Sequence, residues 1–320
     1  MSTTMIKTHK DRNHRFYNSW AQKRKWVSID LVKWLVFSRN RFREEKKRPV
    51  AFPVEAVNFG LLSKDSRDYI VWLGHSTVLM RVGGRTVITD PVFWDVNFLV
   101  RRKTRFPVDP DALPHIDYVL ISHGHYDHLN TKSVRFLKER FDPVFVSGPG
   151  YKDYFRSAGV SRCSPIGWWE ALSGPGVRIT SLPVQHWSRR TIFDANKMLW
   201  CGFLIENLLS GKKYCWLGDT GYFGGFKDIG ERFGPMDFLL VPVGAYEPRW
   251  FMKPNHMNPE EALIAARDLR AKTVIPIHWG TFDLTDEPLY LPIERLKEVY
   301  DDKSGMELKI LNHGGHLVVE

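Results

Sequence analysis

The 320-residue sequence predicts an α/β fold, because short apolar runs typical of buried strands alternate along the chain with segments of helical periodicity. Histidine and aspartate side chains directly follow several of these predicted strands, where α/β sheets commonly build their sites. No run of about eighteen apolar residues is present, so the sequence predicts no membrane-spanning helix. We therefore expect a globular α/β protein with a polar site at the ends of its strands.

The first predicted strands lie in residues 69–91, where "YIVWLGHSTVLMRVGGRTVITDP" indicates a hairpin-like pair around Gly83-Gly84. The run "DYVLIS" (117–122) predicts a buried strand, because β-branched and aromatic side chains dominate it. Three later runs each predict a strand that leads to ligand-type residues. "VRITSLPVQHW" ends at His186, "KKYCWLGDTGY" at Gly218 and Asp219, and "KTVIPIHWGTF" at His278.

Helices are predicted between these strands. The segment "TKSVRFLKERF" (131–141) has apolar residues at helical spacing, and "GPGYKDYFRSAG" follows a Gly-Pro-Gly turn. The segment "NPEEALIAARDLRA" begins with Asn258 as the cap and Pro259 in the first position. No linker is recognisable after Lys64. We therefore expect one catalytic domain over residues 66–320, preceded by an extension over residues 1–65.

The stretch "HGHYDH", His123 to His128, places three histidines and an aspartate directly after the strand predicted at 117–122. Imidazole is a common ligand of zinc and similar ions, and a carboxylate can hold a second ion beside the first. In this spacing His123 and His125 can point at one ion, while Asp127 and His128 turn toward another. A surface loop rich in histidine by chance is the alternative, but the cluster favours a metal site.

A site for two ions needs more than these four ligands, and ligand types recur after the later strands at His186, Asp219 and His278. Taken singly, a histidine such as His186 or His278 is more often a core residue whose hydrogen bonds are satisfied. Together with the first cluster these residues are better explained as one shell of ligands.

The charge of the chain is concentrated at its N-terminus. Residues 1–50 contain fourteen Lys and Arg against four acids, which accounts for the whole net charge of +10. The run "DLVKWLVF" adds apolar and aromatic side chains beside basic residues 39–48, a combination that suits an anionic membrane surface. The same segment could instead pack on the domain with its charges solvated. Nucleic acid is not an expected partner, because the neutral remainder shows no basic stripe.

The N-terminal residues lack the apolar centre of a secretory signal, so we expect a cytoplasmic protein that associates peripherally with membrane. The three cysteines are too few and too scattered for a disulfide framework. The sequence leaves open whether the chain forms a homodimer and which metal it carries in the cell.

Several stretches together resemble the N-acyl-phosphatidylethanolamine-hydrolysing phospholipase D family of the metallo-β-lactamase fold superfamily. They are "WLGHSTVLM", "TDPVF", "LISHGHYDHL", "PVQHWSRRT", "GDTGYFGGFKDIGERFGPMDFLLVPVGAYEPRWFMKPNHMNPEEA" and "IHWGTF". The resemblance extends from about Tyr69 to Phe282. It implies an αββα sandwich, two sheets faced by helices, with metals at one sheet edge. The segment after "TDPVF", "WDVNFLVRRKTRF", departs from the family pattern, which leaves acyl-chain preference open.

The resemblance also implies the roles of individual residues. His123, His125 and His186 would hold a first Zn²⁺, Asp127, His128 and His278 a second, and Asp219 would bridge the two ions. Asp127 would also steer a proton, and Tyr126 and His256 match positions near the substrate head group. Arg189 and Arg190, directly after "QHWS", suit a phosphate or a lipid head group, or solvate their loop.

In this family the expected reaction is the hydrolysis of N-acyl-phosphatidylethanolamine to N-acylethanolamine and phosphatidic acid. Three alternatives stay open. A lactonase acting on phosphorylated sugar lactones would need a closed polar pocket instead of the Trp and Phe density of "YEPRWFMK". A metallo-nuclease would need a basic path to the metals, and a non-enzymatic metal-binding scaffold would not need a complete ligand set.

Overall fold

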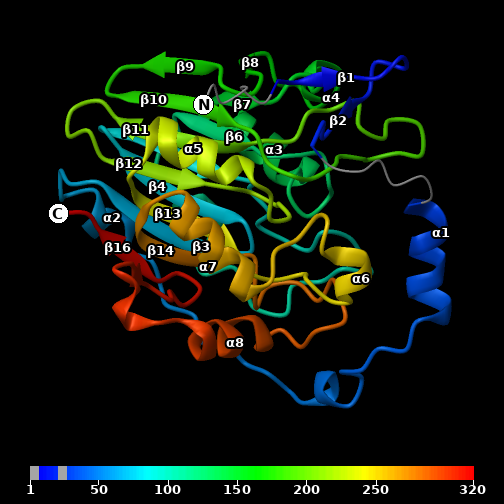
Figure 1. Cartoon of the computed structure of the whole chain (residues 1–320). Coiled ribbons are helices and arrows are strands. Elements are labelled where there is room, and N and C mark those ends of the chain that lie inside the picture. The colour runs from blue at the N-terminus through cyan, green and yellow to red at the C-terminus, as the bar shows by residue number, and fades with distance from the viewer. Residues whose placement is uncertain (1–6, 21–26) are drawn as a thin grey trace.

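The computed structural model, which describes residues 7–20 and 27–320, confirms the α/β fold as a sandwich of two seven-stranded sheets with helices on the outside (Figure 1). Residues 1–6 and 21–26, which belong to the predicted N-terminal extension, lie outside the described residues, as do the side chains of residues 27–29 and of Leu35. Within the described part of the chain no helix has the length and apolar character needed to cross a membrane.

The first sheet has the strand order β16-β3-β4-β5-β6-β7-β8. Its strands are β3 (Tyr69–Gly74), β4 (Thr77–Val82), β5 (Arg85–Thr89), β6 (Tyr118–Ile121), β7 (Val144–Ser147), β8 (Cys163–Pro165) and β16 (His316–Val318). The hairpin around Gly83-Gly84 is present, but the prediction of only two strands in residues 69–91 is wrong. The chain also turns at Gly74 and His75, whose φ angles of 103° and 54° interrupt the extended backbone and separate β3 from β4.

The second sheet has the order β15-β14-β13-β12-β11-β10-β9. Its strands are β9 (Ala171–Gly174), β10 (Val177–Leu182), β11 (Gly202–Asn207), β12 (Lys213–Trp216), β13 (Met236–Pro242), β14 (Ala271–Ile277) and β15 (Glu307–Leu308). The predicted end of one strand at His186 is wrong, because β10 ends at Leu182. Pro183 has no N–H to continue the ladder, and His186 is instead carried by a loop that pairs once, through Gln185 and Gly221.

The helices lie on the outside of the sandwich, most of them on the outer faces of the two sheets. They are α1 (Val27–Val32), continued by a π-helix (Lys33–Phe37), α2 (Phe59–Leu62), α3 (Thr131–Phe141), α4 (Lys152–Ser157), α5 (Gly225–Phe233), α6 (Arg249–Met252), α7 (Pro259–Asp268) and α8 (Leu291–Val299), with short 3-10 helices at Glu45–Lys47, Pro110–Ala112 and Asp302–Ser304. The predicted cap of α7 is confirmed, because Asn258 and Glu261 form a reciprocal capping box.

Two buried clusters hold the layers together. The larger joins side chains of both sheets, among them Trp72 and Trp216, to α5, α7 and α8. The smaller packs α2, α3 and α4 on the first sheet through residues such as Val119 and Phe145. The three cysteines are free, as predicted. This core leaves the loops at the C-terminal ends of the parallel strands to form the site.

The described parts of the N-terminal segment pack against the sandwich. A short hairpin of β1 (His9–Lys10) and β2 (Phe16–Tyr17) inserts Phe16, only 2% exposed, into the larger cluster. Trp20 stacks on Phe223 with ring centroids 4.7 Å apart. Farther along, Trp34 packs on Phe251 of α6, so that α1 stands beside α6 at the side of the molecule (Figure 1). Much of the described N-terminal segment therefore packs on the domain, which is one of the two alternatives raised for it.

Candidate metal centre

Loops that leave the strands of both sheets bring the candidate ligands to one place. His75 follows β3, Asp90 follows β5, His123 follows β6, Asp219 follows β12 and His278 follows β14. The C-terminal ends of these strands meet at one edge of the sandwich, which is where open α/β sheets place their ligands. All seven residues that the sequence suggested as metal ligands lie within this group or beside it.

The first set of ligand atoms comes from His123, His125 and His186. The Nε2 atom of His123 lies 2.8 Å from Nδ1 of His125, and Nε2 of His186 lies 3.4 Å from the same atom. Nitrogen ligands about 2.0–2.1 Å from one tetrahedral ion lie roughly 3 Å from one another. The three nitrogens are therefore spaced as they would be around a single ion.

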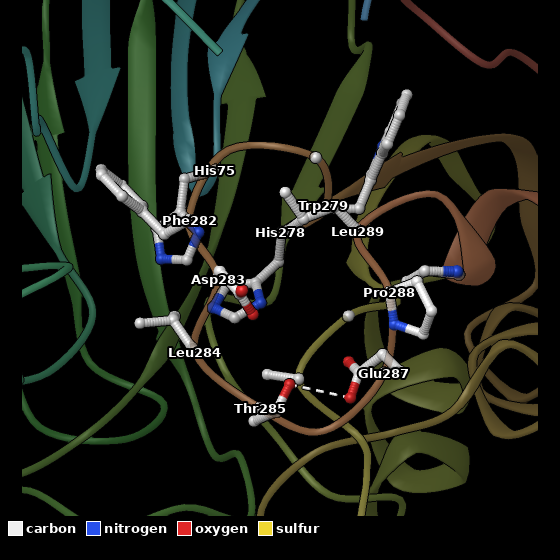
Figure 2. A pocket seen from close by; sticks show the side chains of 14 residues that line it. His75, His278, Trp279, Phe282, Asp283, Leu284, Thr285, Glu287, Pro288 and Leu289 are labelled. Atoms are coloured by element: carbon white, nitrogen blue, oxygen red, sulfur yellow. Dashed lines mark hydrogen bonds between the residues drawn. The ribbon is translucent and has the colours of Figure 1, made fainter. Parts of the chain in front are cut away.

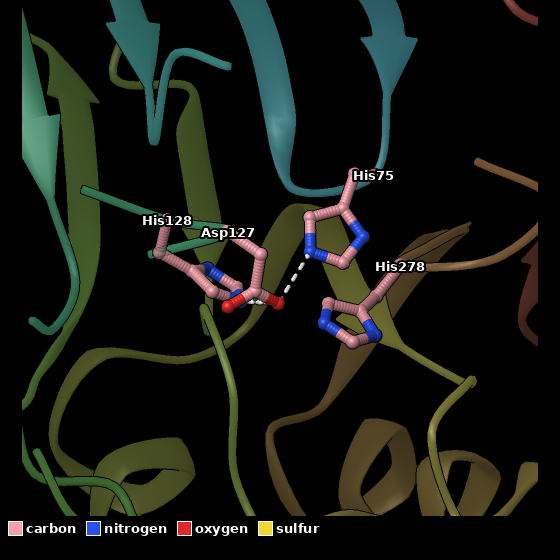
Figure 3. A group of neighbouring side chains, drawn as sticks. All are labelled: His75, Asp127, His128 and His278. Carbon is pink, nitrogen blue, oxygen red and sulfur yellow. Dashed lines mark hydrogen bonds and ion pairs between the residues drawn. The ribbon is translucent and has the colours of Figure 1, made fainter. Parts of the chain in front are cut away.

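The second set contains His75, Asp127, His128 and His278, whose side chains point toward one another (Figure 3). Oδ2 of Asp127 lies 3.4 Å from Nε2 of His128. Asp219 stands beside this set and contacts it with both oxygens: Oδ2 lies 3.2 Å from Nε2 of His128, and Oδ1 lies 3.1 Å from Nε2 of His278.

Asp219 also belongs to a group with His186, a member of the first set, and with His256. Its carboxylate therefore lies between the two sets of ligand atoms. A buried carboxylate in this place can balance the charge of two neighbouring cations, which is the role that the family resemblance implied for it.

Each of three candidate histidine ligands has a partner on its other ring nitrogen. Nδ1 of His123 lies 2.8 Å from Oγ of Ser122, and Nδ1 of His128 lies 2.6 Å from Oδ2 of Asp90. Nδ1 of His186 lies 3.1 Å from the backbone carbonyl of Asn255. Such partners fix the ring and leave Nε2 directed at an ion.

Several buried atoms of the site make no hydrogen bond with the described residues. They are Nε2 of His128, Nε2 of His278 and Oδ1 of Asp219. A buried polar atom without a partner costs about 1–3 kcal/mol, so a cation that accepts these lone pairs would remove that cost. The donor set of imidazole and carboxylate also matches the preference of zinc-class ions. The residues present therefore fit a metal centre.

The ionisation of the histidines suits metal binding. Burial lowers the pKa of His125 to about 4, and burial together with neighbouring imidazoles lowers the pKa of His123 well below its ordinary value. The pKa of His186 is also lowered well below its ordinary value by burial. These rings are therefore neutral near pH 7, and the neutral imidazole is the form that binds a metal.

The pKa values of the two carboxylates are lowered, although burial alone would raise them. Burial raises the pKa of Asp127 and Asp219, but the His128 ring outweighs it and holds the pKa of both acids well below the usual range. Both side chains are therefore ionised near pH 7. The site therefore combines the neutral rings of His123, His125 and His186 with two negative charges, and these charges outweigh burial and raise the pKa of His128 well above its ordinary value.

The suggested substrate residues lie around this centre. His256 places Nδ1 3.8 Å from Oδ2 of Asp219, with its side chain 14% exposed, and burial lowers its pKa to about 4. Tyr126 is half exposed, and its hydroxyl donates to the backbone carbonyl of Arg190. The Arg189 guanidinium lies over the ring of Trp187, which packs edge-on against His125.

Arg190 is engaged with the loop that carries the ligands. Its Nη1 donates to the carbonyls of Gly124 and Leu129 at 3.1 and 2.7 Å. Its guanidinium also lies over the rings of Tyr126 and Tyr154. Arg190 therefore braces the loop from Gly124 to Leu129, in line with the second alternative raised for it.

A small pocket lies on the side of the site lined by His75 and His278 (Figure 2). Its opposite wall includes Glu287, whose carboxylate accepts hydrogen bonds from Thr285 and from the backbone N–H of Tyr246. The volume of about 20 Å³ is close to that of one water molecule, so this pocket is too small for an organic substrate.

Two residues of the site were not identified from the sequence, His75 and Asp90. His75 was hidden because Tyr69 to Val82 was interpreted as one strand, so the turn after Gly74 was missed. Asp90 was noticed only as the end of a strand. The available signal was the same as for His278, a ligand-type residue directly after an apolar run.

Metal loading is expected to stabilise the protein, since an ion that binds only the folded chain shifts the unfolding equilibrium. An ion at about 100 times its Kd adds about 2.7 kcal/mol. In a chain of 320 residues that corresponds to a rise in Tm of roughly 4–5 °C. Thermal unfolding of chelator-treated protein with added Zn²⁺ measures the shift, with Mg²⁺, which prefers oxygen ligands, as the control. An unchanged Tm with Zn²⁺ would contradict the metal centre.

Comparison with known proteins agrees with this geometry. A family model described as a beta-lactamase superfamily domain matches residues 85–279. A N-acyl-phosphatidylethanolamine-hydrolyzing phospholipase D of Caenorhabditis elegans is 31% identical over 313 residues, covering 92% of this chain and 87% of that protein. A mitochondrial protein of the same name from Saccharomyces cerevisiae is 37% identical over 242 residues, covering 72% of this chain and 51% of that protein.

A solved structure supports the fold independently. A metallo hydrolase from the archaeon Ignicoccus hospitalis superposes with a TM-score of 0.61 at 22% identity, covering 80% of this chain and 99% of that one. The predicted metallo-β-lactamase sandwich is thus confirmed, and the protein is a metal-dependent hydrolase with candidate His and Asp metal-binding clusters. The chain belongs to the N-acyl-phosphatidylethanolamine-hydrolysing phospholipase D family of the β-lactamase superfamily.

Proposed function

We propose that this protein uses two zinc ions to hydrolyse N-acyl-phosphatidylethanolamine to N-acylethanolamine and phosphatidic acid. The observation that carries the two-ion part is the position of Asp219, a buried carboxylate between the set of His123, His125 and His186 and the set of Asp127, His128 and His278. The lipid part is supported by the names of the relatives from Caenorhabditis elegans and Saccharomyces cerevisiae.

Two such ions, when bound, would lower the pKa of a coordinated water molecule into the neutral range and would neutralise charge on phosphate oxygens. The side chains of the protein then have distinct tasks. Asp219 balances the charge of both ions, and Asp127 balances the second ion and accepts a proton from the attacking water. His256 and Tyr126 lie where they can contact the substrate around the phosphate.

The hydrolysis breaks the bond between phosphorus and the oxygen of the N-acylethanolamine group. The oxygen of water adds to phosphorus, and the alcohol leaves with a proton as phosphatidic acid forms. The guanidinium of Arg189, which lies over the ring of Trp187, would interact with the phosphate or with a neighbouring head group. Arg190 would contribute mainly by bracing the ligand loop, since its guanidinium already donates to two backbone carbonyls of that loop.

The substrate assignment is tested with purified, zinc-loaded protein. We expect release of N-acylethanolamine from N-acyl-phosphatidylethanolamine, slower turnover of phosphatidylcholine, and loss of both activities after chelation. Mass spectrometry of a membrane lipid extract before and after incubation measures the products without assuming the substrate. Efficient opening of phosphorylated sugar lactones, with the phospholipids untouched, would replace this proposal with the lactonase alternative.

We also propose that the enzyme works at an anionic membrane surface from the cytoplasmic side. Apolar side chains stand exposed on three segments: Val36 and Phe37 after α1, Phe98 and Leu99 after β5, and Ile192 and Phe193 after Arg190. Phe193, for example, is 73% exposed on a loop that hydrogen-bonds with Arg190 through Asp194. Basic residues from Arg39 to Arg48 adjoin Phe37 and would attract anionic lipid.

Removing the whole N-terminal segment would not test membrane binding cleanly. The Asn18 side chain donates to the backbone carbonyl of His186 at 2.9 Å, and Trp20 Nε1 donates to Oε1 of Gln185 at 3.0 Å. A truncated chain would therefore lose support for a metal ligand as well as its basic charges. Substitutions of exposed side chains separate the two effects.

The expected result is that Phe37→Ser combined with Phe193→Ser weakens co-sedimentation with anionic vesicles, and that high salt weakens it further. Salt acts because counterions screen charges beyond about 8 Å at physiological ionic strength. Leu209→Ser is the matched control, since Leu209 is 80% exposed but precedes β12, at the end of that strand away from Asp219. Equal binding by all three proteins would contradict the membrane assignment.

A further inference from the structure

We infer that His75 is a positioning residue: its Nε2–H holds the carboxylate of Asp127 toward the second metal ion, and His75 is not itself a ligand. This inference rests on the metal centre of the proposed function but does not depend on its lipid substrate. His75 is not among the residues for which the family resemblance implied a role.

The contact between the two side chains is short and buried. Nε2 of His75 lies 3.1 Å from Oδ2 of Asp127, and His75 is 2% exposed (Figure 3). The ring lies 4.0 Å from the ring of His278 between centroids and packs edge-on against Phe282 at 5.0 Å. These neighbours leave the imidazole little room to turn away from Asp127.

The backbone of His75 is fixed on both sides. Its N–H donates to Oγ1 of Thr281 at 2.7 Å, and its carbonyl accepts from Nε1 of Trp72 at 2.9 Å and from the N–H of His278 at 3.0 Å. Thr281 in turn contacts Nε2 of the buried His313. These bonds hold His75 at a φ of 54°, a conformation that is unfavourable for most residues. The turn therefore stores strain to keep one ring in one place.

The arrangement matches the outer partners of the histidine ligands. His123, His128 and His186 are each oriented by a group that is not a ligand, namely Ser122, Asp90 and the carbonyl of Asn255. His75 supplies Asp127 with a partner of the same kind. An Nε2–H that donates to Asp127 has no lone pair for a metal, so the two roles exclude each other at that nitrogen.

Three substitutions distinguish positioning from ligation. In His75→Gln the amide nitrogen reaches nearly as far as Nε2 and can still donate to Asp127. In His75→Asn the amide is one carbon shorter and cannot reach, although asparagine tolerates the left-handed backbone. His75→Ala removes the donor altogether. His115→Ala serves as the control, because His115 is an exposed histidine packed on Phe141, on a segment that supplies no ligand.

The measurement is Zn²⁺ affinity of the full chain, by competition with a chelator of known affinity, alongside kcat. We expect His75→Asn and His75→Ala to weaken the second ion by about 10–100-fold, the usual cost of losing such a partner, and to leave the first unchanged. His75→Gln and His115→Ala should bind like wild type. His75→Ala should add no further loss in an Asp127→Asn background, since the two changes remove the same contact.

Different failures have different outcomes. If His75→Gln loses the second ion as completely as His128→Ala does, His75 is a ligand and the inference is wrong. If wild type binds two ions and His75→Ala binds them equally well, His75 has no role in metal binding. The inference is then wrong, while the two-ion centre stands. If wild type binds one ion at most, the two-ion centre and this inference fail together. Thermal unfolding of each chelated variant shows whether a loss of zinc binding reflects unfolding. If His75→Ala is unfolded, the His75→Asn variant tests the inference in its place.

Discussion

Replacing Asp219 by alanine is expected to remove metal and activity together. The carboxylate lies 3.1 Å from Nε2 of His278 and 3.2 Å from Nε2 of His128, and it groups also with His186 of the other set. Alanine would leave the ions without the charge that balances both. If this interaction supplies about 4 kcal/mol to the transition state, activity falls by roughly 1,000-fold.

Elemental analysis after purification without chelator measures the metal, and a phosphodiester assay measures kcat. We expect close to two ions per wild-type chain and at most one in Asp219→Ala. Asp68→Ala is a suitable control, because Asp68 is also buried but bonds to Asn207 and Tyr214, away from the site. That variant should lose stability while keeping its metals. An Asp219→Ala protein that retained two ions and normal kcat would contradict the bridging role.

Asp127→Asn is expected to abolish most turnover with little change in fold. The amide keeps the size of the side chain, which is 18% exposed, so packing is preserved. It cannot balance the charge of a second ion, and it cannot accept a proton. Loss of a positioned proton acceptor alone typically costs about 100- to 10,000-fold in kcat. Steady-state kinetics and circular dichroism, measured on the same preparation, separate the chemical effect from the structural one.

Asp111→Asn provides the comparison for this change, because Asp111 is an exposed acid in a 3-10 helix. It should leave both kcat and the spectrum unchanged. Near-normal kcat for Asp127→Asn on any phosphodiester would remove Asp127 from the proposed proton transfer.

The position of the ligand cluster at the end of a strand could be predicted from local sequence. "DYVLIS" has the composition of a buried strand, and β6 occupies Tyr118–Ile121, so the histidines had to lie in the loop that follows. The same reasoning located His278 after β14 and Asp219 after β12. In each case a strand of apolar residues ends within three residues of the candidate ligand, so the position of the ligand can be predicted from the local sequence pattern.

The turn at His75 could not be predicted by that reasoning. Residues 69–82 are almost continuously buried, and the polar residues His75, Ser76 and Thr77 that separate the two apolar runs are buried with them, so they do not mark an exposed turn. What breaks the strand is the backbone at Gly74 and His75, which is held by bonds to the neighbouring Trp72 and to the distant Thr281. Thr281 lies 206 residues away in the sequence, so its contact leaves no local signal.

His186 shows a related limit. Its segment is apolar enough to resemble a strand, yet Pro183 ends β10 and the loop is held by distant groups. These include the carbonyl of Asn255 and the side chain of Asn18. The composition of the N-terminal segment likewise could not predict whether it packs on the protein, since basic and aromatic residues suit both a membrane and a protein surface.

The most direct test of the account is the fate of the water oxygen when the zinc-loaded protein hydrolyses N-acyl-phosphatidylethanolamine in water enriched in the heavy oxygen isotope. The account predicts, by mass spectrometry, phosphatidic acid with one heavy oxygen and unlabelled N-acylethanolamine, and neither product after chelation. Label in a released fatty acid would show attack at a carbonyl instead of phosphorus and would contradict the account, as would unlabelled phosphatidic acid.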